Sequence, residues 1–257
     1  MENGDILLAH GLGGKTALVT GASSGLGARF AHVLAAAGAR VIIVARRLDR
    51  LEELEKQIKN TGGEIISQEF DVNNISAIEE FYQNLEKQGW MPDILVNNAG
   101  MNVVGAALDL SIDDYQTIIS TNMSAPFFLA REFARHHIAA GNPARIINIA
   151  SVGAREVLPG ITPYCMSKSG ILMMTRGLAR EWARHDINVN AICPGYIETE
   201  INDFWWQTEG GKKQISGFPR RRLAGQEDLD GALLLLAGVQ GKGMTGTSIT
   251  VDDGQYI

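Results

Sequence analysis

The spacing of apolar and polar positions along the chain follows two different periods. Short apolar runs rich in β-branched residues predict strands. These runs fall at residues 16–20, 41–45, 64–70, 93–96, 145–150, 188–192 and 247–251. Longer amphipathic stretches predict helices at residues 28–37, 48–60, 75–88, 112–140, 163–184 and 227–237. The segment at residues 196–222 is less regular.

The alternation of strands and helices predicts the fold class. Strands joined by helices form a parallel sheet with helices on both faces, so we expect an α/β fold with a doubly wound sheet. Right-handed crossovers then place the carboxyl ends of all strands on one edge, where open α/β sheets bind ligands. No Pro/Ser-rich linker or clear repeat divides the chain, so residues 1–257 are expected to form one domain.

Composition narrows the range of functions. The chain is 45% hydrophobic and 20% charged, as expected of a soluble globular protein. Its net charge of −6 gives no basic footprint for nucleic acid. Its apolar runs, such as residues 233–237, are too short to span a bilayer, and residues 1–5 lack the basic start of a signal peptide. Two cysteines, Cys165 and Cys193, are expected to be reduced, which favours a cytoplasmic location.

A glycine-rich loop separates the first predicted strand from the first helix. Gly21, Gly25 and Gly27 follow the pattern G-x-x-x-G-x-G. Glycines let a backbone turn tightly and approach a pyrophosphate, and the helix that follows presents free N–H groups to it. The pattern therefore predicts a dinucleotide site. The expected contact residues of this loop are Gly21, Ser23, Ser24, Gly25, Leu26 and Gly27.

The end of the second strand predicts which dinucleotide binds. A carboxylate there would bind the ribose 2′-hydroxyl of NAD and repel a 2′-phosphate. Ala45 occupies that position, and Arg46 and Arg47 follow it. Arginine suits a phosphate through its planar fork of donors, so we expect NADP(H). The alternative is that both arginines are solvated residues leading into a charged helix.

Tyr164 and Lys168 lie four residues apart within a predicted helix. That spacing places the phenol and the ammonium on the same helix face. A nearby cation favours the phenolate, so we expect the pKa of Tyr164 to fall toward neutrality and the phenol to exchange a proton with a substrate oxygen. The alternative is a chance pair on an exposed helix.

Motifs in a fixed order give the chain a resemblance to a known family. They are the glycine loop, Asp71-Val72, Asn97-Asn98-Ala99-Gly100, Thr121-Asn122, Ser151, Tyr164-x-x-Ser167-Lys168 and Pro194-Gly195. In this order they resemble the single-domain branch of the short-chain dehydrogenase/reductase family, from about residue 14 to the C-terminus. The resemblance implies a seven-stranded Rossmann sheet of strand order 3-2-1-4-5-6-7 and a homotetramer.

The resemblance also implies roles for individual residues. Tyr164 would be the general acid or base, Lys168 would hold the nicotinamide ribose, Ser151 would steady the substrate oxygen and Asn122 would anchor a water. Taken singly, Asn122, Ser151 and Asp71 could instead be a helix tie, a turn residue and a helix cap. The further cofactor contacts implied are Asp71, Val72, Asn98, Ala99, Gly100, Pro194, Gly195, Ile197 and Thr199.

These residues predict an NADPH-dependent reductase of ketones or 3-oxoacyl thioesters. An NAD-dependent secondary alcohol or polyol dehydrogenase, or a non-catalytic NADP-binding scaffold, are the alternatives. By resemblance, a lid at about residues 196–222 covers the substrate, and its aromatic run at 204–206 suits an apolar ligand or packing of the lid. Arg220, Arg221 and Arg222 would meet an anionic carrier or remain solvated. No spacing of His, Cys and Asp suggests a metal site.

Overall fold

A parallel sheet runs through the centre of the protein in this computed structural model, which describes residues 11–199 and 203–257. Within those residues seven strands pair in the order β3-β2-β1-β4-β5-β6-β7, all parallel. The strands are β1 (Thr16–Thr20), β2 (Arg40–Ala45), β3 (Ile65–Glu69), β4 (Ile94–Asn97), β5 (Ala144–Ile149), β6 (Ile187–Pro194) and β7 (Ser248–Val251). The predicted fold class and strand order are confirmed.

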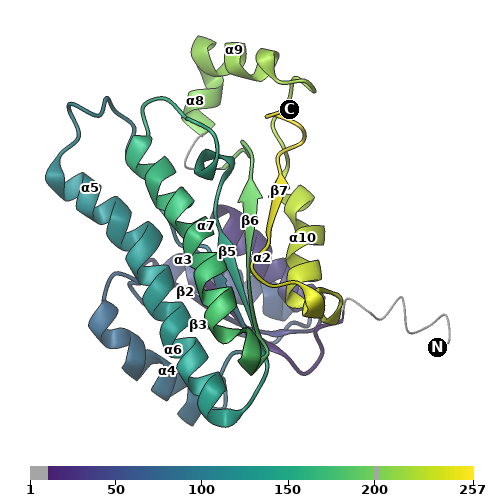
Figure 1. The fold of residues 1–257 in the computed structure, drawn as a ribbon. Coiled ribbons are helices and arrows are strands. Elements are labelled where there is room, and N and C mark those ends of the chain that lie inside the picture. The colour runs from purple at the N-terminus through teal and green to yellow at the C-terminus, as the bar shows by residue number, and fades with distance from the viewer. Residues whose placement is uncertain (1–10, 200–202) are drawn as a thin grey trace.

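Helices cover both faces of the sheet (Figure 1). One layer contains α2 (Gly25–Ala36), α3 (Leu48–Asn60) and α10 (Asp230–Ala237), and the other contains α4 (Ile78–Lys87), α6 (Ala125–Ala140) and α7 (Thr162–Trp182). Alternate strand residues divide between the two layers, since Ala17 and Val19 pack with the first and Leu18 with the second. Central strands that are buried on both faces explain why the sequence shows continuous apolar runs there.

The predicted helix at residues 112–140 is divided in the structure. It comprises α5 (Ile112–Ile119), a π-helical turn (Ser120–Ser124) and α6. Thr121 and Asn122 are buried in that turn. A π turn inserts extra backbone into a helix and is frequent at functional sites. Asn122 therefore does not occupy the position that the predicted continuous α-helix would give it.

The less regular segment contains two helices, α8 (Asp203–Gln207) and α9 (Glu209–Gly217). Both lie beyond the carboxyl ends of the strands, close to the C-terminus of the chain (Figure 1). Residues 200–202 of the expected lid, and the N-terminal residues 1–5, lie outside the described residues. Across the described part of the chain, no helix is both long and apolar enough to cross a membrane.

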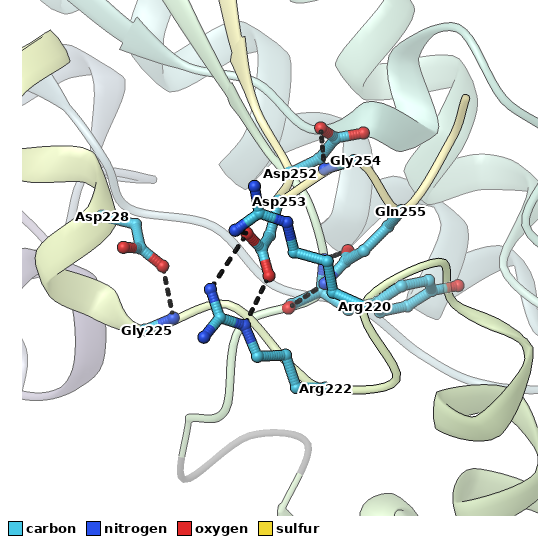
Figure 2. Close-up of polar contacts among 9 residues, drawn as sticks. Arg220, Arg222, Gly225, Asp228, Asp252, Asp253, Gly254 and Gln255 are labelled. Atoms are coloured by element: carbon cyan, nitrogen blue, oxygen red, sulfur yellow. Dashed lines mark hydrogen bonds and ion pairs between the residues drawn. The ribbon is translucent and has the colours of Figure 1, made fainter.

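Two arginines connect the end of this segment to the residues after β7 (Figure 2). Arg220 NH1 lies 3.0 Å from Asp253 Oδ1, and Arg222 Nε donates to Asp253 Oδ2 at 2.7 Å. Hydrogen bonding with Arg222 and the charge of both arginines lower the pKa of Asp253. We call this cluster the Asp253 clasp. It shows that two of the three consecutive arginines are bound to an acid rather than merely solvated.

Candidate active site

The predicted site residues gather at the carboxyl edge of the sheet, where each follows a different strand. They are Gly21 after β1, Arg46 and Arg47 after β2, Asp71 after β3, Asn98 after β4, Ser151 after β5 and Gly195 after β6. Asn122 comes from the π turn, and Tyr164 and Lys168 come from the first two turns of α7. The fold thus brings together residues that are separated by up to about two-thirds of the sequence.

The glycine loop packs against the loop that follows β4. Gly21 has φ +67°, and a Cβ atom there would lie 2.7 Å from the Ala99 Cα. The Asn98 side chain donates to the carbonyl oxygens of Thr20 and Gly21, at 2.9 and 3.2 Å. The backbone N–H groups of Asn98 and Ala99 both donate to Thr20 Oγ1 at 3.0 Å. Glycine is therefore required at position 21, both by its backbone conformation and by the space available.

Arg47 faces the glycine loop. Its guanidinium donates to Ser23 Oγ from Nε and NH2, at 3.2 and 2.9 Å, and NH2 also donates to Ser24 Oγ at 3.0 Å. Arg46 and Arg47 are exposed, and neither forms an ion pair with a carboxylate within the described ranges. Cationic donors beside a glycine-lined helix N-terminus fit the 2′-phosphate and pyrophosphate of NADP(H).

The loop after β3 is tied to the π turn. Asp71 Oδ1 accepts from the Asn73 backbone N–H at 2.9 Å, which is a turn-forming contact, while Val72 is buried. The Asn73 side chain donates to Thr121 Oγ1 and accepts from Ser120 Oγ, at 2.9 and 2.8 Å. Asp71 therefore forms a turn rather than the helix cap that was the alternative, and its contact with adenine stays a prediction.

Asn122 links the loop after β4 to α7. Its Nδ2 donates to the Met101 carbonyl oxygen at 2.9 Å and to Ser167 Oγ at 3.0 Å, and its Oδ1 accepts from the Met101 N–H at 2.9 Å. Ser167 Oγ in turn donates to the Tyr164 carbonyl oxygen at 2.7 Å. Both amide hydrogens of Asn122 are used, so its tie between the helix and a neighbouring loop is observed. The water that it would anchor stays a prediction.

Lys168 is buried beside Tyr164. Its Nζ donates to the Ile149 carbonyl oxygen at 2.8 Å and lies 5.6 Å from the centroid of the Tyr164 ring. A Cβ atom at Gly100 would lie 3.5 Å from that Nζ, so only a small residue brings the β4 loop this close. Burial lowers the pKa of Lys168 to about 8.

The pKa of Tyr164 does not shift in the predicted direction. Its surroundings desolvate the phenolate and raise the pKa, while a hydrogen bond with the Ser151 side chain opposes the rise. The expected decrease caused by Lys168 is therefore wrong for the protein on its own. Lys168 is itself desolvated and directs its Nζ to a backbone carbonyl, so its charge does not dominate at the phenol.

Ser151 and the loop after β6 complete the edge of the site. Ser151 Oγ accepts from the Gly153 N–H at 3.0 Å and caps a short 3₁₀ helix (Val152–Ala154). The Thr199 side chain lies 3.7 Å from the position of a Cβ at Gly25, which brings the β6 loop against the glycine loop. Pro194 and Ile197 are buried beneath this loop. Cofactor contacts of these residues stay predictions.

The C-terminal residues hold the β6 loop, a contribution that no motif in the sequence indicates. Gln255 Oε1 accepts from the Tyr196 backbone N–H at 2.6 Å, and Gln255 Nε2 donates to the Tyr196 carbonyl oxygen at 2.9 Å. A Cβ atom at Gly195 would clash with Gln255 Oε1, so glycine is needed for this contact. No local motif marks Gln255. The only signal is an amide side chain close behind the last strand.

No metal centre is found in the described ranges, where no group of three or more His, Cys, Asp and Glu residues is arranged to hold an ion. The titratable groups near Tyr164 are the Lys168 ammonium, the Tyr196 phenol and two thiols. Cys165 and Cys193 are free, and burial raises the pKa of the Cys193 thiol. The arrangement of Tyr164, Ser151 and Lys168 suits proton transfer at a bound oxygen.

Comparison with curated proteins gives consistent matches. The family model for short chain dehydrogenase matches residues 15–210. The chain is 36% identical over 250 residues to 2-dehydro-3-deoxy-D-gluconate 5-dehydrogenase of Escherichia coli, covering 97% of this chain and 98% of that protein. It is 32% identical over 247 residues to gluconate 5-dehydrogenase of Gluconobacter oxydans, covering 95% of each. It is 32% identical over 242 residues to 3-oxoacyl-acyl-carrier-protein reductase of Chlamydia pneumoniae, covering 94% and 96%.

Solved structures with the same fold contain NADP. A gluconate 5-dehydrogenase from Burkholderia cenocepacia, in complex with NADP and tartrate, has a TM-score of 0.93 and 31% identity, covering 97% of this chain and 98% of that chain. A putative 2-deoxy-D-gluconate 3-dehydrogenase from Agrobacterium tumefaciens with bound NADP has a TM-score of 0.90 and 33% identity, covering 96% and 98%. Both likenesses cover at least 96% of this chain.

Proposed function

The chain belongs to the short-chain dehydrogenase family, and from this premise we propose that it interconverts a ketone and a secondary alcohol of a polyhydroxylated carboxylic acid, using NADP(H). The observation that carries the proposal is the joint placement of Tyr164, Lys168 and Ser151 beside a glycine cradle with Arg47 at its rim. The cradle fits a dinucleotide phosphate, and the phenol fits a substrate oxygen.

The chemistry of the reacting oxygen is assigned to three side chains. The bound cofactor supplies the hydride. Tyr164, whose raised pKa keeps it protonated near neutral pH, gives its proton to the substrate oxygen in the direction of reduction. Ser151 Oγ accepts from the Gly153 N–H, and its hydroxyl hydrogen-bonds Tyr164, so a substrate oxygen that meets the phenol also meets the Ser151 hydroxyl. Lys168 holds a proton close behind the phenol, with a pKa of about 8.

The preference for NADP(H) rests on the end of β2. Ala45 leaves no carboxylate at that position, and Arg47 extends from the following residues onto Ser23 and Ser24. The structural relatives solved with NADP support the same cofactor. An NAD-linked polyol dehydrogenase would have to discriminate against a 2′-phosphate without any acid at this point. NADP(H) is therefore the cofactor that the chain's own residues favour.

Two substrate classes have support from the relatives. Their names include several dehydrogenases of gluconate or its derivatives, and also a 3-oxoacyl reductase, a putative ketoacyl reductase and a probable dienoyl-CoA reductase. Two of the three arginines considered for an anionic carrier, Arg220 and Arg222, bind Asp253 instead. That engagement favours a sugar acid, which needs no long acyl-carrier handle, over the 3-oxoacyl thioester.

The test is a substrate panel monitored by NADPH absorbance. The panel contains 5-keto-D-gluconate, a 3-oxoacyl thioester and simple ketones, each with NADPH and NADH, and gluconate with NADP⁺ for the reverse direction. We expect turnover of the keto acid with NADPH to exceed turnover of the thioester. Turnover confined to the thioester would transfer the assignment to an acyl reductase, and a preference for NADH would remove the NADP assignment.

Assembly, location and domain division are further proposals. Exposed apolar side chains on α5, α6 and α7, such as Ile112, Phe127 and Met173, support a homotetramer joined through these helices. The free cysteines support a cytoplasmic location. Placement of α8 and α9 beyond the strand ends supports a single domain whose segment 196–222 is a lid. Sedimentation analysis of the purified protein would test the assembly, with a monomer contradicting it.

A further inference from the structure

Tyr196 lies where the lid, the C-terminal residues and the β6 loop meet. Its ring contacts Trp206 of α8 edge-on, with centroids 5.2 Å apart, and stacks on Phe218 at 5.7 Å. On another side it contacts the Tyr256 ring at 6.2 Å. Gln255 fixes the Tyr196 backbone through both its amide atoms. The position of this ring is therefore determined from three directions.

Trp206 carries a donor without an acceptor. Its side chain is 4% exposed, and the indole Nε1–H has no hydrogen-bond partner within residues 11–199 and 203–257. Buried polar groups are almost always satisfied, and an unsatisfied one is destabilising. The adjacent Trp205 shows the ordinary arrangement, since its Nε1 donates to Gln214 Oε1 at 2.9 Å. The indole N–H of Trp206 is therefore able to donate to an acceptor that a ligand supplies.

The Tyr196 ring contacts this indole, and the Tyr256 ring in turn contacts Tyr196. The Tyr256 hydroxyl hydrogen-bonds the Tyr196 hydroxyl, and burial raises the pKa of Tyr256. The Tyr196 hydroxyl is also close enough to act electrostatically on Tyr164. The cluster of Trp206, Tyr196 and Tyr256 therefore borders the reacting centre without belonging to the catalytic set. We call it the aromatic subsite.

We propose that the aromatic subsite binds a hydroxyl group of the substrate, one or more carbons away from the carbonyl, with Trp206 as hydrogen-bond donor and the two phenols as further partners. The inference rests on the proposed function and adds a determinant of specificity to it. A hydroxyl both donates and accepts, so it suits an indole N–H and a phenol together. Glu156 lies close enough to influence Tyr256, and its negative charge disfavours a substrate carboxylate at the same place.

The test compares three ketones with the full-length protein and NADPH. 5-Keto-D-gluconate has the hydroxyls and the carboxylate, 5-oxohexanoate has the carboxylate alone, and the corresponding ketohexose has the hydroxyls alone. The variants are Trp206→Phe and Tyr256→Phe. Their matched controls are Trp205→Phe, whose indole already has a partner, and Tyr115→Phe on the exposed face of α5.

We expect each subsite variant to lower kcat/KM about tenfold for both hydroxylated ketones, mainly through KM, because one hydrogen bond is lost. The kcat/KM for 5-oxohexanoate should change by less than about twofold. The control variants should leave kcat/KM unchanged for all three ketones. An equal loss of kcat/KM on all three ketones would show that these side chains contribute only packing, which overturns the proposal. A loss of kcat/KM restricted to the two ketones that carry a carboxylate would show that the subsite binds the carboxylate, which also overturns the proposal.

Failure of the proposed function would be seen separately. If the unmodified protein turned over none of the three ketones, the binding of gluconate to the NADP⁺ complex would be measured by calorimetry instead. Binding about tenfold weaker in Trp206→Phe than in Trp205→Phe supports the subsite, whereas equal binding, or no binding by the unmodified protein, overturns it. Tyr256→Phe removes a single oxygen atom and keeps the test decisive if Trp206→Phe does not fold.

Discussion

The Nζ of Lys168 lies 5.6 Å from the centroid of the Tyr164 ring and donates to the Ile149 carbonyl oxygen rather than to the phenol. The two groups thus share one face of α7 without a direct hydrogen bond. Burial shifts both toward their neutral forms, raising the pKa of Tyr164 and lowering that of Lys168. At neutral pH the phenol is therefore neutral, while Lys168, with a pKa of about 8, is still mainly protonated. Reduction of a carbonyl needs this combination of a neutral proton donor and a cation behind it.

Tyr164→Phe removes the proposed proton donor and keeps the ring. We expect turnover to fall by about 10²-fold or more, because the alkoxide formed by hydride transfer loses its proton source. NADPH affinity and thermal stability should change little, since α7 packs through other residues. Stopped-flow turnover and fluorescence titration with NADPH measure the two effects. A variant that retained its rate would contradict the role of Tyr164 and favour the scaffold alternative.

The rate of reduction is expected to depend on pH through Lys168. Its pKa of about 8 makes it cationic below that pH and neutral above it, while the raised pKa of Tyr164 keeps the phenol protonated throughout. We therefore expect kcat/KM for reduction to decline above about pH 8 with the loss of one proton. Lys168→Arg, which stays charged, should be slower but should lack this inflection. An unchanged inflection in that variant would assign it to another group.

Arg47 is expected to determine the choice of cofactor. Arg47→Ala removes the guanidinium held by Ser23 and Ser24, so the dissociation constant of NADPH should rise at least tenfold while that of NADH stays nearly constant. Adding Arg46→Ala should weaken the binding of NADPH further. Lys56→Ala, which removes an exposed charge from α3, is the control and should affect neither cofactor. Equal weakening of NADPH and NADH would show that no 2′-phosphate is bound there.

The sequence predicted those parts of the site that depend on local pattern. The apolar runs placed all seven strands, and the parallel topology then required residues such as Gly21 and Ser151 to meet at one edge. The spacing of Tyr164 and Lys168 placed both on one helix face without any tertiary information. Each of these inferences needs only the periodicity of one element or the handedness of its connections.

The remaining features depend on contacts that span long separations in sequence. The π turn is stabilised by Asn122 bonding to Met101, and apolar periodicity continues through it without a signal. Gln255 reaches Tyr196 across 59 residues, and no motif connects them. The direction of the Tyr164 pKa shift depends on desolvation, which follows from the packed structure alone.

Gly21 offers a test that separates backbone strain from lack of space. Gly21 and Gly62 both have positive φ, but a Cβ at Gly62 meets nothing within 4 Å, whereas one at Gly21 meets the Ala99 backbone. Gly62→Ala should lower the free energy of unfolding by about 1–2 kcal/mol through strain alone. Gly21→Ala should lower it by a further 1–3 kcal/mol or so because of the overlap. Urea denaturation measures both, and equal losses would show that the glycine loop has room to relax.

The Asp253 clasp is expected to act on the lid rather than on global stability. Arg220 and Arg222 are more than half exposed, so the change in Tm for Asp253→Asn should be small. The link between the end of the lid and the C-terminal residues would nevertheless be weakened, so amide hydrogen exchange in α9 should accelerate while exchange in α6 stays unchanged.

A second exposed ion pair on the lid provides the control for this prediction. Glu209→Gln breaks the pair of Lys212 and Glu209 within α9 and leaves the clasp intact, so it should not accelerate exchange across the segment. The lowered pKa of Asp253 also sets a pH dependence, because the clasp keeps its charge as pH falls until that lowered pKa is reached. Exchange in α9 of the unmodified protein should therefore remain protected at mildly acidic pH. If Glu209→Gln and Asp253→Asn accelerated exchange equally, the clasp would have no special part in holding the lid.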